Sequence, residues 1–485
     1  MDTRALIVAV TVSFSFACKS ECEQFAEQVL AAQDENPLME LIVQTDEDKK
    51  VFAKVFPDAL CTCLEPKLRG TTLSELVASD EGALNDCAFD AGEKAGEAVA
   101  ALSSDEPATP SGPQIDFCGD KHDANTASLS CYDEVSSFDA LAKFTALTSL
   151  DLVSVQGGDL APIGALKSLE ALSLGGPGVK GLEFLTELSK LESFRLNGAP
   201  VETLESLVPL AATLKSLELR ELPETTDLTP VGKLTRLESL SLFWVGAKDL
   251  APLAPLIALK QLEIQDDSEA PIDFLAGMSK LESLNVSTRE PPSWKPLAKL
   301  SMLTELDIAA TNIESLAPTA KLGRLKTLSV MGNGIKSLAG IEKLPKLESL
   351  DISGTAIRDI RPLKKLTGLK KLDVSDTSVS KIKVLESIPS LVSVNLGETE
   401  VRSLKPLSKL QNLESVYLIQ GKVRDVTPLM ELPKLCKVNL WNAKVSAQQA
   451  SALAKKLRSS CDYASVTGPD GELVEEPGED ADSPE

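Results

Sequence analysis

A six-residue pattern, Leu-x-x-Leu-x-Leu with apolar substitutions, occurs fourteen times in this chain, first at Leu147 and last at Leu435. Eleven of the thirteen steps between successive copies are 22 residues long, and the other two are 23. A fixed period of this length is typical of a solenoid, in which each repeat forms one coil that cannot bury its apolar face without its neighbours. The period therefore predicts a stack of fourteen coils with a long open surface. Such a surface favours binding over catalysis.

The pattern within each repeat predicts its local structure. Counting from the first Leu, positions 1, 4 and 6 are apolar and are expected to point inward, as are positions 11, 14 and 20. Proline recurs at position 16, where its fixed φ and missing N–H suit the first turn of a short helix. Each unit is thus predicted to be a short strand, a turn and a short helical or 3₁₀ segment. The prolines are Pro162, Pro252, Pro296, Pro318, Pro362, Pro406, Pro428 and, after a one-residue insertion, Pro230.

The full consensus resembles a known class. Residues 347–363 read Leu-x-x-Leu-x-Ile-x-x-Thr-x-Ile-x-x-Ile-x-Pro-Leu, which resembles the 22-residue leucine-rich repeats of bacterial internalins, a class shared by eukaryotic phosphatase-1 regulators. The resemblance covers roughly residues 130–446. It implies a right-handed α/β horseshoe with parallel strands on the concave face and short helical or 3₁₀ segments on the convex face. We expect no immunoglobulin-like module or wall anchor after the repeats, and therefore do not expect the internalin role in host invasion to carry over.

One position departs from that class. Position 9, where a ladder of Asn is expected, is mostly Thr in this chain, and Asn333 is the clear exception. A hydroxyl group can still bond to the backbone, so the turn is expected to survive. The threonines are Thr311, Thr355, Thr377 and Thr399.

The first 17 residues resemble a signal peptide. The apolar run from Ala5 to Ala17 has 13 residues, too few to span a bilayer, which needs about 20. Cleavage after Ala17 is expected. The same stretch also resembles a bacterial lipobox that makes Cys18 the lipidated N-terminus, although Ser15 and Phe16 depart from that motif. The predicted location is the bacterial cell envelope, through a lipid anchor and facing the periplasm or the surface, or the exterior after simple secretion.

Composition divides the rest of the chain into segments. Residues 18–100 are predicted to form a small all-α domain and residues 101–114 a linker. Residues 115–146 are expected to cap the repeats of residues 147–445 at one end, and residues 446–466 to cap them at the other with a helix over 446–459. The last segment, residues 467–485, is acidic and is predicted to be disordered.

Nine cysteines bear on the compartment and on the caps. If Cys18 carries lipid, eight remain, an even number that suits an oxidising compartment. A bond between Cys118 and Cys131 would tie down the N-terminal cap, and one between Cys436 and Cys461 would pin the C-terminal helix over the last coil. The pairing within the helical domain stays open, and its candidates are Cys22, Cys61, Cys63 and Cys87.

Charge and missing residue types narrow the function. The net charge is -23, but residues 19–106 and 467–485 account for -21 of it, so the repeats are nearly neutral. No Lys/Arg stripe is expected, and nucleic acid is therefore not a predicted partner. The single histidine, His122, cannot build a His-based metal cluster. We predict no enzyme activity, cofactor or metal, with activity in residues 19–100 as a minor alternative.

The concave face is predicted to hold the partner. Position 3 is often Ser and positions 7 and 8 are often small, so the face is expected to be smooth except at two places. Large exposed side chains there are candidate hot spots for binding. The alternative for Trp244 and Trp441 is that they fold over an edge or under a cap, while Trp294 at position 14 is assigned to the core. The partner-binding candidates are Arg220, Phe243 and Trp244 in one place and Tyr417, Ile419 and Trp441 in the other.

Four acidic residues also share the middle of this face: Glu218, Glu263, Asp266 and Asp307. They favour a basic partner or weak Ca²⁺ binding, against the simpler reading of a solvated surface. Together these features predict a non-catalytic module that binds a protein partner of unknown identity on its concave face. The alternative function is a cytosolic scaffold similar to the phosphatase regulators, with free thiols.

Overall fold

The computed structural model describes residues 114–474 except 266–270, 288–290, 292, 460, 462 and 463. The chain divides into two units, residues 1–111 and 112–485, and every described residue belongs to the second unit. The predicted signal peptide, the lipidation site Cys18, the helical domain with its four cysteines and nearly all of the linker lie outside the described residues. Asp266 and residues 475–485 do as well.

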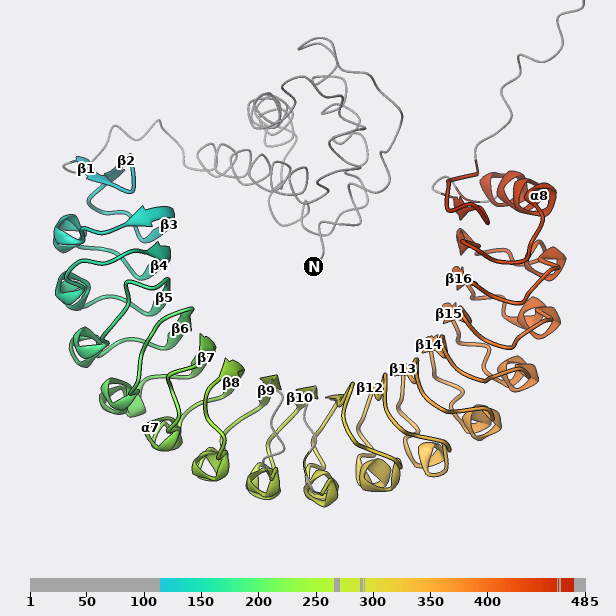
Figure 1. The fold of residues 1–485 in the computed structure, drawn as a ribbon, viewed down its shortest axis with the longest axis horizontal. Helices are drawn as coiled ribbons and strands as arrows, with labels where there is room; N and C mark the ends of the chain where they lie inside the picture. Colours follow the sequence, from blue (N-terminus) through green and yellow to red (C-terminus); the bar gives the residue numbers. More distant parts are fainter. Residues whose placement is uncertain are drawn as a thin grey trace, which may run out of the picture. The chain divides into compact units, whose positions relative to one another are not determined.

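The solenoid unit is an arc whose concave side is a 16-stranded parallel sheet (Figure 1). Neighbouring strands pair in exact repeat register, so that Leu350 lies opposite Leu372 and Ser349 opposite Lys371. The fourteen repeats supply β4 to β17, as predicted. The two further strands, β3 (Ser128–Val135) and β18 (Ser465–Thr467), come from the caps and extend the sheet by one strand at each end.

The repeat strands have the following bounds: β4 Ser149–Val155, β5 Ala171–Gly175, β6 Ser193–Asn197, β7 Ser216–Leu222, β8 Ser239–Val245, β9 Gln261–Gln265, β10 Ser283–Ser287, β11 Glu305–Asp307, β12 Thr327–Ser329, β13 Ser349–Asp351, β14 Lys371–Asp373, β15 Ser393–Asn395, β16 Ser415–Tyr417 and β17 Lys437–Asn439.

The convex side is built of short 3₁₀ segments and one short helix, α7 (Thr229–Gly232). Each of the eight prolines at position 16 is the second residue of such a segment, which confirms the predicted role of proline. The 3₁₀ segments are Asp139–Lys143, Ala161–Ala165, Glu183–Glu187, Glu205–Ala212, Ala251–Leu253, Asp273–Gly277, Lys295–Lys299, Ala317–Lys321, Ile341–Lys343, Arg361–Lys365, Lys383–Ser387, Lys405–Lys409 and Thr427–Leu429.

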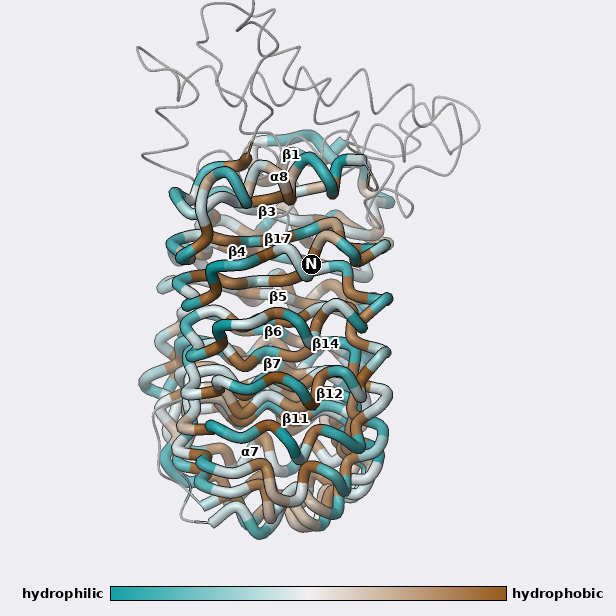
Figure 2. Tube along the Cα trace, turned by 90° about the vertical axis from the view of Figure 1, so that its right-hand side faces the viewer, coloured by the Kyte–Doolittle hydropathy of each residue, from teal (hydrophilic) through white to brown (hydrophobic). Residues whose placement is uncertain are grey.

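The core is one continuous layer of aliphatic side chains between the sheet and the convex segments. Leu350 and Ile352, at positions 4 and 6 of one repeat, are 1% and 0% exposed, and their equivalents stack upon them from coil to coil. Figure 2 shows apolar and polar segments alternating around each coil. Trp294 belongs to this core, as predicted, and its indole N–H donates to Asn312 Oδ1 at 2.9 Å.

Position 9 closes the turn after each strand with a side-chain hydrogen bond. The hydroxyl of Thr355 donates to Ile352 O at 2.6 Å, and Thr377 repeats this bond with Val374 O at 2.6 Å. Asn333 does more: its amide donates to Ile308 O and Val330 O, and its Oδ1 accepts from Thr311 N. The prediction that hydroxyl groups replace the Asn ladder is confirmed.

Position 8 has left-handed backbone in repeat after repeat. Seven residues other than glycine adopt φ between 49° and 53° there, although this conformation costs a residue with a Cβ about 1–2 kcal/mol. The same conformation in so many coils shows that the repeat geometry imposes it. The residues are Glu221, Trp244, Ala310, Asp376, Glu398, Gln420 and Asn442.

The N-terminal cap is a hairpin of β1 (Gln114–Phe117) and β2 (Asp120–Asp123) beside β3. A disulfide joins Cys118 to Cys131, as predicted. The rings of Phe117 and Phe144 pack edge to face at 6.4 Å, which covers the end of the core. The strand begins at Gln114, the last residue of the predicted linker.

The C-terminal cap contains the predicted helix, α8 (Ala447–Arg458), whose N-cap Ser446 accepts from Gln449 N at 3.3 Å. A disulfide joins Cys436 in the last repeat to Cys461, again as predicted. The expectation of disorder from residue 467 is wrong for residues 467–474. This segment turns back on β18, and Val474 N donates to Val466 O at 2.8 Å.

We expect Asn333→Ala to destabilise the solenoid by about 2–3 kcal/mol, because it leaves several buried backbone groups without partners. Asn333→Thr should lose less, since threonine makes the turn bond in neighbouring coils. Urea unfolding followed by tryptophan fluorescence tests this, because all three tryptophans lie in the solenoid. Equal losses in the two variants would contradict the role assigned to the amide.

Candidate functional site

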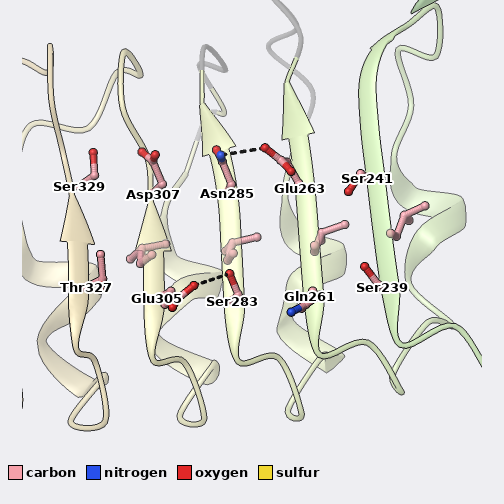
Figure 3. A pocket seen from close by; sticks show the side chains of 14 residues that line it. Ser239, Ser241, Gln261, Glu263, Ser283, Asn285, Glu305, Asp307, Thr327 and Ser329 are labelled. Atoms are coloured by element: carbon pink, nitrogen blue, oxygen red, sulfur yellow. Dashed lines mark hydrogen bonds between the residues drawn. The ribbon is translucent and has the colours of Figure 1, made fainter. Parts of the chain in front are cut away.

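The centre of the concave face holds a polar depression of 360 Å³, which we call the central pocket. It extends over β8 to β12, and its walls are two rows of side chains from positions 3 and 5 (Figure 3). Its polar lining residues are Ser239, Ser241, Gln261, Glu263, Ser283, Asn285, Glu305, Asp307, Thr327 and Ser329. The lining contains three carboxylates and no lysine or arginine.

Hydrogen-bond acceptors outnumber donors in the middle of this pocket. Asn285 Nδ2 donates to Glu263 Oε1 at 3.1 Å, and Ser283 Oγ donates to Glu305 Oε2 at 3.3 Å (Figure 3). Asn285 Oδ1 is a buried atom that has no hydrogen-bond partner among the described residues. Burial raises the pKa of Glu263, and the charges of Glu218 and Asp307 add to the effect while Arg220 opposes it. An ammonium or guanidinium group fits this environment.

Carboxylates also stand at position 5 of later repeats, and we call Glu263, Asp307, Asp351 and Asp373 together the acidic strip. In its later members the strip also has a structural role. Asp307 Oδ1 accepts from Ala309 N at 2.9 Å, and Asp351 Oδ1 accepts from Ser353 N at 2.9 Å. These bonds close an Asx turn, and β11, β12 and their successors span only positions 3 to 5. Burial raises the pKa of Asp351, and Asp373 and Asp307 add to the effect.

The first predicted binding cluster is packed together, but one of its members is covered. The Arg220 guanidinium lies over the Phe243 ring at 3.8 Å, and Glu218 holds Arg220 and Arg195 in ion pairs, with an Arg195 Nη2 to Glu218 Oε2 distance of 3.1 Å. Phe243 is therefore only 5% exposed, and its prediction as an exposed contact is wrong. Trp244 beside it is 56% exposed.

The second predicted cluster lies at the C-terminal end of the sheet. Trp441 is 48% exposed and lies against Gly471 of the C-terminal turn, so one edge of the indole is covered by the cap. Tyr417 is half-buried, with Lys437 Nζ 5.8 Å from its ring, and Ile419 is also half-buried. Eight strand spacings separate the two clusters, from β8 to β16, or about 38 Å along the sheet, so no small ligand contacts both.

Sequence analysis missed several residues of the central pocket. Gln261, Asn285 and Glu305 were not singled out, although their positions 3 and 5 were expected to face outward. Positions 3 and 5 considered together could have indicated the pocket, because it forms where small Ser and Thr residues lie between acidic ones. Neither position alone distinguishes this place.

Within the described part of the chain, no group of three or more His, Cys, Asp or Glu side chains is placed to hold a metal ion. His122 contacts Phe117 O at 3.0 Å in the N-terminal cap, away from the concave strands. No helix among these residues is long and apolar enough to cross a membrane.

Comparison with known proteins agrees with the fold. The family model for leucine-rich repeats in two copies matches residues 323–365 and 345–387. No curated protein matches the sequence. The internalin InlF of Listeria monocytogenes is similar in structure, with 25% identity and a TM-score of 0.53 over 66% of this chain and 89% of that chain.

Two other structures share the fold alone. A leucine-rich-repeat protein of Leptospira interrogans has 20% identity and a TM-score of 0.54 over 71% of this chain and 90% of that one. TLR13, solved in complex with the RNA ssRNA13, has 20% identity and a TM-score of 0.52 over 64% of this chain and 49% of that one. The chain thus contains leucine-rich repeats that form an internalin-like solenoid.

We expect Asp351→Asn to stabilise the solenoid near pH 7 by less than about 1 kcal/mol, because partial exposure screens the repulsion. The pKa of Asp351 is raised by folding, so its charge costs stability above that pKa. The cost disappears as pH falls below the unfolded value of about 3.9. The gain should therefore vanish near pH 3.

Asp359→Asn in the same repeat is the matched control. Its hydrogen bonds with Arg361 lower the pKa of Asp359, so its charge stabilises the fold above the unfolded pKa. This substitution should reduce stability near pH 7. The measurement is urea unfolding at both pH values, and the same sign for both variants would refute the assignment.

Proposed function

We propose that this chain is a non-catalytic binding module whose concave face holds a protein partner. Leucine-rich-repeat proteins typically mediate protein–protein interactions, and the sheet offers a long row of outward side chains on a fixed spacing. The observation that carries the proposal is the central pocket, which combines Glu263, Glu305 and Asp307 with the unpartnered Asn285 Oδ1. The partner inserts a lysine or arginine side chain there.

The exposed aromatic residues supply further contact area. Trp244 lies in β8, one of the strands that line the central pocket, and Trp441 lies beyond the other end of the acidic strip. Large exposed aromatic residues are typical centres of binding energy. The ion pair of Arg220 with Glu218 and the stacking of Arg220 on Phe243 hold the surface beside Trp244 in place. A basic, extended segment of a partner that follows the acidic strip reaches these anchors.

The first experiment uses a fluorescein-labelled decapeptide of alternating Lys and Ser, with a Glu/Ser decapeptide as its matched probe. The Lys peptide should bind, and Glu263→Gln with Asp307→Asn should weaken binding at least tenfold, or about 1.4 kcal/mol. Glu314→Gln with Glu386→Gln, which removes two exposed acids away from the pocket, should leave binding unchanged. Equal binding by all three proteins, or of both peptides, would reject the pocket as the site.

We also propose that the protein is exported in a bacterium and is tethered to the cell envelope by lipid on Cys18. The sequence of residues 5–18 supports export, and the bonded pairs Cys118–Cys131 and Cys436–Cys461 suit an oxidising compartment. On this proposal the N-terminal domain predicted for residues 18–100 acts as a spacer or second contact. Simple secretion leaves Cys18 as an unmodified thiol.

The intact mass of the mature protein, before and after reduction and alkylation, tests this location. We expect a lipid-sized addition on Cys18 and eight masked thiols. Cleavage without the addition would mean simple secretion. An unprocessed chain with nine alkylatable thiols would instead support the cytosolic scaffold.

A further inference from the structure

One edge of the solenoid carries a column of unpaired cations, which we call the basic ladder: Lys336, Arg358, Lys381, Arg402 and Arg424. The expectation that the repeats lack a Lys/Arg stripe is wrong for this edge. The ladder places one cation in each of five consecutive repeats, and all five side chains are exposed. Each follows by one or two residues a buried aliphatic residue at position 11, which is at most 1% exposed in these repeats. The buried residue at position 11 therefore fixes the backbone position of each cation in the ladder.

The ladder differs from the other charged columns in lacking partners. Elsewhere the chain pairs cations with acids one repeat away, as in Lys215–Glu192, Lys260–Glu238 and Lys370–Glu348, each at 2.7 Å. Among the described residues no ion pair or hydrogen bond involves the side chain of any ladder member. Like charges stacked one coil apart repel each other. An anion bound along this edge would reduce that repulsion.

The acids within the same strip are already engaged. Glu400 is paired with Lys422, and Asp359 is paired with Arg361 at 2.7 Å. A shallow groove of 720 Å³ runs along the ladder, lined by Arg358, Lys381 and Arg402 and also by Glu400, whose carboxylate is held by Lys422. Three serine hydroxyl groups line the same groove, from Ser378, Ser380 and Ser403. Guanidinium groups and hydroxyl donors together suit carboxylate oxygens.

We propose that the C-terminal part of the basic ladder, Lys381, Arg402 and Arg424, binds the acidic C-terminal segment of its own chain, residues 475–485. This segment has six acidic residues and no basic ones in eleven positions, and it has no long apolar side chain that needs a hydrophobic pocket. Its charges are spaced by Pro, Gly, Ala and Ser. A segment with spaced charges suits the ladder better than a dense polyanion, because Glu400 and Asp359 lie among the cations and would repel closely spaced anionic groups.

The segment starts close enough to reach the ladder. Val474 is fixed by its bond to Val466 O in β18, and Arg458 donates to Val474 O. Arg424 follows β16, which lies two strand spacings or about 10 Å from β18. The path from the sheet across one coil to the edge that carries Arg424 takes about five extended residues, or about 17 Å. Eleven extended residues span about 36 Å, so about 9 Å remains beyond Arg424, or two strand spacings, which is enough to reach Arg402 and Lys381. The tether holds the segment at an effective concentration in the millimolar range, so modest contacts suffice.

The test compares the full chain with a chain that ends at Val474. The probe is a fluorescein-labelled peptide of residues 475–485, and its control is the same peptide with Gln and Asn in place of the acids. The truncated chain should bind the acidic peptide at least tenfold more tightly than the full chain, whose ladder is already occupied. Raising NaCl from about 20 mM to 500 mM should abolish binding, because the contact is ionic.

A ladder variant of the truncated chain, Arg358→Gln, Lys381→Gln, Arg402→Gln and Arg424→Gln, should lose at least tenfold in affinity. Its matched control removes four exposed lysines with a 22-residue spacing from the convex segments: Lys299→Gln, Lys321→Gln, Lys343→Gln and Lys365→Gln. This control should bind the peptide as before. All substituted side chains are exposed, so tryptophan fluorescence should report an unchanged or higher unfolding midpoint for the ladder variant.

Three results would overturn the proposal: no binding by the truncated chain, equal binding by the full and truncated chains, or equal losses in the ladder and convex variants. Dextran sulfate serves as a dense polyanion for comparison. If it binds the full and truncated chains equally and the peptide binds neither, the ladder serves a foreign polyanion and not this segment. The proposal is independent of the concave pocket, since none of these variants alters a residue that lines it.

Discussion

The structure depends on contact between one coil and the next. No single repeat encloses a core: the side chains at positions 4 and 6 are buried only because identical positions above and below cover them. The backbone hydrogen bonds between strands and the Lys–Glu pairs at position 2 also join each coil to the next, and the position-9 turn bonds recur in each coil. Truncating a leucine in this stack to alanine removes contacts with two neighbours, and typical costs for such a change are about 2–5 kcal/mol. The outward positions are therefore held in place by residues that have no part in binding.

Sequence predicted those features that a single repeat determines. The strand, the proline-initiated convex segment, the hydroxyl bonds of Thr355 and its equivalents and the core place of Trp294 all follow from local pattern. The disulfides Cys118–Cys131 and Cys436–Cys461 were predicted because the apolar core must be covered at both ends of the solenoid. The cap strands β3 and β18 were missed because they pair with the sheet without carrying the Leu pattern. Phe243 was misjudged because its cover, Arg220, comes from the neighbouring coil.

The acidic strip shows how structural and binding roles overlap on one face. Asp307, Asp351 and Asp373 each use one oxygen to close the turn after a short strand, so their presence alone does not indicate a partner. Glu263 and Glu305 have no such turn to close. Burial and the neighbouring charges raise the pKa of Glu263, which means that the folded face holds this negative charge at a cost. A basic side chain bound beside Glu263 would reduce that cost.

Charge is thus segregated by column, although it nearly cancels over the repeats as a whole. The net charge of the repeat region indicates neither the acidic strip at position 5 nor the basic ladder near position 12, because the two signs lie on different faces of the same coils and cancel in the sum. A period of 22 residues turns a preference at one position into a line of charge several coils long. In the acidic strip Glu263, Asp307 and Asp351 are two strand spacings or about 10 Å apart, whereas the members of the basic ladder are about 5 Å apart. Within a Debye length of about 8 Å at physiological salt, neighbours in the ladder act together. A repeat protein with a modest local charge can therefore present two opposed, extended electrostatic surfaces on one rigid frame.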